Sequence, residues 1–166
     1  MSQQDIDRFR RKCRQFRGLA VFMVVSVGGL LVMTGWGRPL LLWLRGEDPV
    51  PTRFVLAWTI SSLPAACYLT AVWSIGRSMG DLAKGRLIQP TLASALRRVG
   101  IALGVGGVIS VFVVMNLMRL AGLARGGYLH FDVPGMTLGM IGGALYLLGR
   151  VVDQASRVQA ELDEMI

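Results

Sequence analysis

Four long apolar stretches dominate the chain, and short polar or basic segments separate them. They run over about 18–36, 53–75, 99–121 and 131–152, and no charged side chain lies in their central turns. Each has close to the ~20 residues that a helix needs to cross ~30 Å of hydrocarbon. Because lipid offers no partner to backbone N–H and C=O groups, each stretch must satisfy them internally as a helix. The pattern predicts an all-α fold, an integral membrane four-helix bundle in one domain of residues 1–166.

Helical spacing of apolar residues continues beyond the spans at both ends of the chain. The N-terminal set, which has basic neighbours, is Ile6, Phe9, Cys13 and Phe16. The C-terminal set, spaced by three and four residues, is Val151, Ala155, Val158, Leu162 and Met165. We therefore expect amphipathic helical segments at both ends, and the tail 153–166 to continue the last membrane helix. Gly35, Gly37 and Pro39 are expected to end the first helix, with Leu40–Leu44 as a short interfacial piece.

The distribution of Lys and Arg predicts the orientation in the membrane. Most of the 18 basic residues lie in the N-terminal segment, in the connection 76–98 and after the fourth span. The basic residues of the other two connections are Arg38, Arg45, Arg53, Arg119 and Arg125. The positive-inside rule places both termini and the loop 76–98 in the cytoplasm (N-in, C-in).

Composition supports the same conclusion. The chain is 53% hydrophobic and 17% charged, with a mean hydropathy of +0.53, too apolar for the interior of a soluble domain of 166 residues. The net charge of +8 is explained by topology and by anionic lipid headgroups, so we expect no nucleic-acid partner.

Glycines form a repeat in the last two spans. Gly135, Gly139 and Gly143 recur every four residues, as in a glycine zipper, and Gly100 and Gly104 do the same in the third span. Helices approach closely along faces that lack side chains. The third and fourth helices would then pack on each other, which we favour, or these faces would bind a membrane-protein partner or a second copy.

Asn116 is the most polar side chain inside a span. Such a group often forms an ordinary hydrogen bond between helices, and the candidate partners here are Ser61, Ser62, Thr70 and Ser110. Alternatively, it marks a path for a solute or a binding site. A path lined by Asn116, Ser110 and Thr70 keeps a small transporter or channel, or a subunit of one, as the alternative function. The centres of the spans hold no Asp, Glu, Lys or His, which disfavours proton-coupled transport.

The sequence shows no motif for catalysis, cofactors or metals. His130, the single histidine, stands near Asp132 without a nucleophile or further ligands. Cys13 and Cys67 are a membrane depth apart, and P-loop, CxxC and GxSxG patterns are absent. We therefore expect no enzymatic activity, no cofactor and no metal.

The middle connection and the tail resemble a known family. The similar stretches are Leu82-Ala83-Lys84-Gly85 through Pro90, Leu96-Arg97-Arg98-Val99-Gly100, Phe131-Asp132-Val133, Val151-Val152 through Val158 and Glu161-Leu162-Asp163-Glu164-Met165-Ile166. They resemble the bacterial domain-of-unknown-function family 2975 over most of residues 10–166. Leu87 or Ile88 stands where that family favours Phe, and Ala155 where it often has Gly. The resemblance implies a four-helix protein of the bacterial inner membrane with no established reaction. Some members are encoded near small DNA-binding regulators, which hints at signalling.

The leading hypothesis is a non-enzymatic membrane accessory or regulatory protein. It would act through helix–helix packing and through a basic cytoplasmic face, where anionic lipid headgroups or a soluble regulator would bind. The residues expected to form that face are Lys84, Arg86, Arg97 and Arg98.

Overall fold

The computed structural model describes residues 3–46, 51–84, 88–123 and 131–164, and these ranges contain helices and no strand. The α-helices are α1 (Gln3–Val32), α2 (Arg38–Arg45), α3 (Thr52–Ala83), α4 (Ile88–Val108), α5 (Val114–Leu120) and α6 (Val133–Glu164). Two π-helical segments join neighbouring helices: η1 (Met33–Gly37) lies between α1 and α2, and η2 (Ile109–Val113) between α4 and α5. The expected all-α fold is confirmed.

Four helical segments are long and apolar enough to cross a membrane: Arg11–Gly37, Thr52–Leu82, Thr91–Leu120 and Val133–Gln159. They include the four stretches expected from the sequence almost completely, and they extend past them. The difference has a physical cause, because the apolar pattern reports the thickness of the hydrocarbon, whereas a helix continues into the headgroup region. The four-helix membrane bundle is therefore confirmed.

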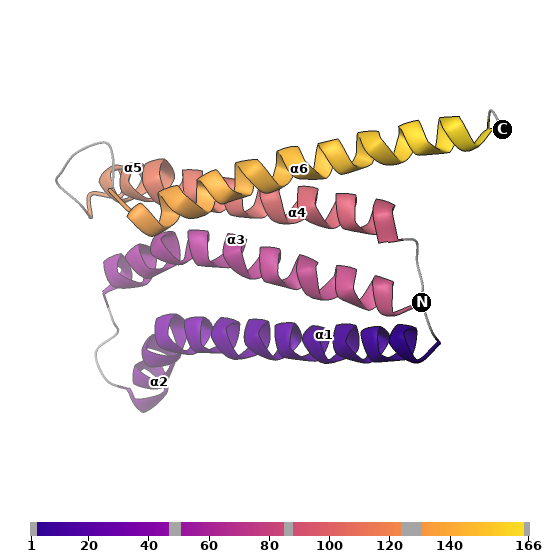
Figure 1. Cartoon of the computed structure of the whole chain (residues 1–166). Coiled ribbons are helices and arrows are strands. Elements are labelled where there is room, and N and C mark those ends of the chain that lie inside the picture. The colour runs from indigo at the N-terminus through magenta and orange to yellow at the C-terminus, as the bar shows by residue number, and fades with distance from the viewer. Residues whose placement is uncertain (1–2, 47–50, 85–87, 124–130, 165–166) are drawn as a thin grey trace.

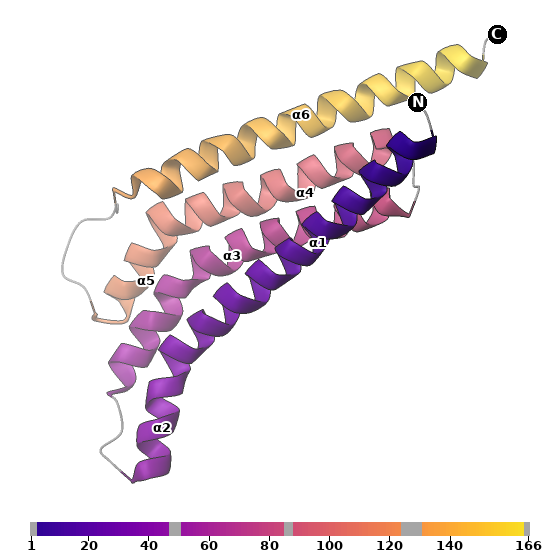
Figure 2. The same ribbon diagram turned by 60° about the horizontal axis from the view of Figure 1, so that its bottom comes forward.

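The long helices lie side by side in chain order. α1 packs on α3, α3 on α4, and α4 on α6 in the most extensive contact of the molecule. Both views show this order, with α1 and α6 at the two edges (Figures 1 and 2). The two chain ends, the end of α3 and the start of α4 lie at one end of the layer, here called the terminal end (Figure 1). α2 and α5 lie at the other, here called the opposite end (Figure 1).

The interior of this layer is thin and is built from small side chains. Among the described residues no large side chain is fully buried, and the buried apolar residues are Cys13, Ala20, Ile60, Ala71, Ala93, Val99 and Val111. Large apolar side chains point outward instead, such as Phe22 and Met140, which are 73% and 79% exposed. Such an outward-facing apolar surface fits a helix bundle surrounded by lipid.

The first membrane span ends at Gly37, among the glycines and proline expected to end it, but the helical backbone continues without a loop. The chain passes from α1 through η1 directly into α2, with Pro39 in the first turn of α2. Proline is tolerated there because the N–H groups of a first helical turn have no partner within the helix. α2 then ends at Gly46, whose φ of 69° is the left-handed conformation that favours glycine. The expected interfacial piece Leu40–Leu44 is part of α2.

The connection expected over 76–98 is largely helical. α3 continues to Ala83, Lys84 follows in a turn, and α4 already begins at Ile88. α6 likewise continues from the fourth span to Glu164, so that the tail from 153 onward prolongs the same helix.

Candidate functional site

Glycines bring the backbones of α4 and α6 into direct contact. A Cβ atom built on Gly100 would lie 2.5 Å from the backbone nitrogen of Tyr146. One built on Gly142 would lie 2.7 Å from the carbonyl oxygen of Gly100. Real Cβ atoms do not come this close to backbone atoms. Any side chain at these glycines would therefore force the two helices apart.

Two glycines of the predicted zipper, Gly135 and Gly139, face α4, whereas the third, Gly143, is exposed. A Cβ on Gly107 would lie 2.6 Å from the carbonyl oxygen of Gly135 and 2.7 Å from the Cα of Gly139, so both of these face α4. A Cβ on Gly143 would meet nothing within 4 Å, and Gly143 is exposed. Gly104 meets α6 through its backbone, although its own Cβ would be unobstructed.

The positions of α6 that face α4 follow a mixed spacing of four and three residues: Gly135, Gly139, Gly142, Tyr146 and Gly149. Sequence reasoning missed Gly142 and Gly149 because it followed a strict spacing of four. That spacing drifts around a helix of 3.6 residues per turn, whereas alternating four and three stays on one face.

Asn116 bonds within its own span, from α5 to the preceding η2. Its side-chain nitrogen donates to the carbonyl oxygen of Phe112 at 2.7 Å, and the residue is exposed. Three of the partners expected for it also bond to backbone carbonyls of their own helix: Ser61 to Trp58, Ser62 to Thr59 and Thr70 to Cys67. A role of Asn116 in an intramembrane contact between helices stays a prediction.

The fourth expected partner, Ser110, forms the polar contact between helices at the opposite end. Its hydroxyl, in η2, donates to a carboxylate oxygen of Asp132, which directly precedes α6. Ser110 is only 8% exposed. Gly135 lies beneath the pair, because a Cβ there would be 2.9 Å from the Ser110 hydroxyl. Nearby, the Tyr68 ring covers Gly106, and its buried hydroxyl has no hydrogen-bond partner among the described residues.

Basic side chains gather at the terminal end. At this end of α1, α3 and α4 and at the turn after α3, those that are exposed and form no ion pair with a described residue are Arg11, Lys12, Arg14, Arg17, Arg77, Lys84 and Arg98. We call this set the terminal basic cluster. Arg97 and Arg157 differ, because both approach the Asp153 carboxylate, at 3.9 and 3.4 Å. Arg86 lies outside the described residues.

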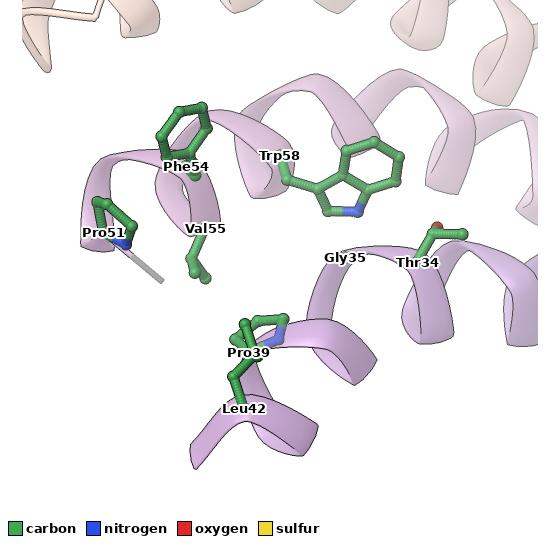
Figure 3. A pocket seen from close by; sticks show the side chains of 8 residues that line it. All are labelled: Thr34, Gly35, Pro39, Leu42, Pro51, Phe54, Val55 and Trp58. Atoms are coloured by element: carbon green, nitrogen blue, oxygen red, sulfur yellow. The ribbon is translucent and has the colours of Figure 1, made fainter. Parts of the chain in front are cut away.

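A cavity of about 420 Å³ opens at the opposite end between α3 and the segment formed by η1 and α2 (Figure 3). Its lining residues are Thr34, Gly35, Pro39, Leu42, Pro51, Phe54, Val55 and Trp58. Gly35 is essential to this shape, since a Cβ there would overlap the Trp58 indole. The lining is mostly apolar and carries no charged side chain, so it suits an apolar group such as an acyl chain and offers no reactive group.

Metal ligands are not gathered in the part of the chain that the structure describes: no three His, Cys, Asp or Glu side chains there could hold one ion. Asp132 is engaged with Ser110, whereas His130 lies outside the described residues.

Four apolar spans around a thin interior define a multi-pass α-helical membrane protein. More particularly, the chain belongs to the family described as protein of unknown function (DUF2975), whose model matches residues 46–166. The match includes α3 to α6 and leaves α1 outside, so it is shorter than the resemblance expected from residue 10 onward. No curated protein and no solved structure matches the chain.

Proposed function

We propose that this chain is a non-enzymatic accessory or regulatory protein of the bacterial inner membrane, with both termini in the cytoplasm. Its function would be to present a rigid basic surface to anionic lipid headgroups and to an acidic partner protein. The observation that carries this proposal is the terminal basic cluster. Its cations are exposed and free of ion pairs with described residues, whereas Arg97 and Arg157 share Asp153.

Electrostatics favours anionic ligands at this end. Each Lys or Arg next to an anionic leaflet contributes about 1 kcal/mol of attraction. The cluster brings together cations from α1, from the last turns of α3 and from α4, which lie near one another at the terminal end (Figure 1). The same excess of positive charge favours a cytoplasmic location for this end.

The helix packing supports a rigid presentation of these charges. Gly100 and Gly142 lock α4 against α6 within the membrane, and the Arg97–Asp153 ion pair joins the same two helices further along. α6 then projects past the ends of the other helices at the terminal end (Figures 1 and 2). A partner that binds there would contact a helix whose position is fixed by the membrane domain.

Retention of lipids and partners by the purified chain tests this proposal. The chain is extracted from native membranes in mild detergent, and the mass of the intact complex is determined for the wild type and for Lys84→Glu/Arg98→Glu. We expect anionic lipid or an acidic protein to be retained in fixed stoichiometry by the wild type and lost from the variant. Arg45→Glu, an exposed charge reversal at the opposite end, is the matched control and should retain both. Equal retention by all three chains would contradict the proposal.

A second candidate, a small transporter or channel, is favoured by the Ser110–Asp132 pair. Polar groups inside a membrane protein often mark substrate paths, and π-helical segments are frequent at functional sites. The hydroxyl of Tyr68, which has no hydrogen-bond partner among the described residues, adds a third polar group on the neighbouring helix. Solute flux in liposomes that is lost in Ser110→Ala would support this candidate. Liposomes without flux for a panel of ions and small solutes would count against it.

A further inference from the structure

The side of α6 that faces away from α4 carries an uncovered apolar seam. Its described members are Ile141, Ala144, Leu148, Val151, Ala155 and Val158, and all six are exposed. The larger ones, Ile141, Leu148, Val151 and Val158, are 50–62% exposed. Their spacing alternates between three and four residues, and Leu162 continues it in the sequence. We call these six residues the outer seam of α6.

The outer seam lies opposite the side of α6 that the chain itself covers. Gly142 and Gly149 meet the backbone of α4, and Asp153 meets Arg97. When the seam residues are assigned to the two core positions of a heptad repeat, Gly142, Gly149 and Asp153 occupy positions on the opposite side of the helix. Both views agree, because α6 is an edge helix with no other element beyond it (Figures 1 and 2).

Part of the seam extends beyond the hydrocarbon. α6 has 32 residues, so it is roughly 48 Å long, against about 30 Å of hydrocarbon. Arg150 and Asp153 mark the region where the helix leaves the lipid core. Lipid covers Ile141 and Leu148, but Ala155 and Val158 lie in the headgroup region or in water. Apolar residues in a sustained heptad there require another surface to cover them.

The residues beside the seam favour a second helix over the membrane surface. Helices that lie on an anionic leaflet have a polar face rich in Lys and Arg. Beyond Val152, α6 carries one basic residue, Arg157, against the four acidic residues Asp153, Glu161, Asp163 and Glu164, so an anionic leaflet would repel it. When two identical heptad helices pair in parallel, Gln154 of one copy faces Gln159 of the other. That arrangement avoids the repulsion that like charges would cause.

We propose that two copies of this chain associate in parallel through the outer seam of α6, as a left-handed coiled coil that begins in the membrane and continues beyond it. The 3.5-residue period of the seam sets the left-handed supercoil. A two-fold axis along the membrane normal gives both copies the same orientation. Ala144 lets the helices approach closely within the hydrocarbon, where packing contacts drive association in the absence of the hydrophobic effect. Beyond the hydrocarbon, burial of Ala155 and Val158 from water adds to it. This dimer does not depend on which anionic ligand the terminal basic cluster binds.

Disulfide crosslinking in native membranes tests the dimer. Cys13 and Cys67 are replaced by alanine, and single cysteines are introduced as Val151→Cys, Val158→Cys or Arg157→Cys. Arg157 is the matched control, because it adjoins Val158 in sequence and is exposed but lies off the seam. After mild oxidation we expect several-fold more dimer, with twice the mass of the chain, from the two seam variants than from Arg157→Cys.

Three results would overturn the proposal. One is a crosslinking yield from the seam variants no higher than from Arg157→Cys. Another is a crosslinked product that contains a different protein. The third is a Val158→Cys variant that forms no crosslink but that lipid vesicles protect from reaction with a water-soluble maleimide. That result would place the seam on the membrane surface. Val158→Glu gives an independent check, since it should yield a monomeric mass in detergent with unchanged helix content. A dimer that persists in this variant would also refute the seam.

Discussion

Gly142 and Gly143 are neighbours in sequence but have opposite surroundings. A Cβ on Gly142 would collide with the backbone of α4, whereas one on Gly143 would meet nothing within 4 Å. Backbone atoms cannot move aside without separating the helices. We therefore expect Gly142→Ala to lower the free energy of unfolding in detergent by about 1–3 kcal/mol, the usual effect of overpacking.

The control for this prediction is Gly143→Ala, measured in the same thermal unfolding experiment. Because its Cβ enters open space and alanine favours the helix, its stability should equal or slightly exceed that of the wild type. If the two variants lose the same stability, the close approach of α4 and α6 at Gly142 does not exist in the protein.

Gly35 and Trp58 form a second site at which a single Cβ decides the packing. A methyl group on Gly35 would overlap the Trp58 indole, so Gly35→Ala should displace the ring and destabilise the protein by about 1–3 kcal/mol. The same change in a Trp58→Ala background should cost much less, because the colliding group is gone. A double-mutant cycle of unfolding free energies measures this coupling. Additive losses would show that the ring does not lie over Gly35.

Sequence reasoning identified the importance of glycine in the last two spans but not which glycines meet. Gly135 and Gly139 face α4, as their spacing indicated, while Gly142 replaces Gly143 on that face. Which neighbour faces inward depends on the rotation of one helix relative to the other. Side chains on both helices fix that rotation together, so the pattern of one helix alone does not determine it.

At the scale of elements, the contact between η2 and the start of α6 combines the packing of Gly135 against Ser110 with one hydrogen bond. Ser110 donates to Asp132 from a buried position, so Ser110→Ala leaves the carboxylate without this donor. We expect a loss of about 1–3 kcal/mol, as is typical when a buried partner of a charged group is removed. Amide hydrogen exchange should report the loss as faster exchange in the first turns of α6. Ser94→Ala is the control, because its hydroxyl donates to the carbonyl of Thr91 in its own helix rather than to another element.

If amide exchange at the start of α6 is the same in Ser110→Ala and Ser94→Ala, the Ser110–Asp132 bond does not hold this end of the helix in place.

The extents of the elements show what apolar patterns do and do not predict. The four spans were predictable because lipid demands long uncharged helices. The continuation of α6 was predictable from the spacing of Val151, Ala155 and Val158. The passage from α1 through η1 into α2 was not, because glycine and proline usually end helices in water. Ser110–Asp132 was equally hidden, since it joins residues of two elements whose relative placement no local pattern encodes.

At the scale of the whole molecule, the order of the helices gives the two edges different properties. α1 exposes large side chains such as Phe22, whereas the outer seam of α6 includes the small Ala144 and Ala155. The sequence predicted four packed helices but not which of them would lie at the edges. That order depends on which helix faces carry side chains small enough for two helices to approach closely. The contact between α4 and α6 is the closest because glycines line both sides of it.

The asymmetry of charge between the two ends leads to a last prediction, about orientation. The terminal basic cluster should face the cytoplasm, because segments rich in Lys and Arg are retained on that side during insertion. In a chain without Cys13 and Cys67, Arg45→Cys should react with a membrane-impermeant maleimide added to intact right-side-out vesicles. Arg157→Cys, at the terminal end, should react only after the vesicles are opened with detergent.

The reverse pattern would place the terminal basic cluster outside the cytoplasm. The proposed binding of a cytoplasmic partner would then fail, while the seam on α6 would be unaffected, because pairing of identical helices does not depend on which side of the membrane they project into.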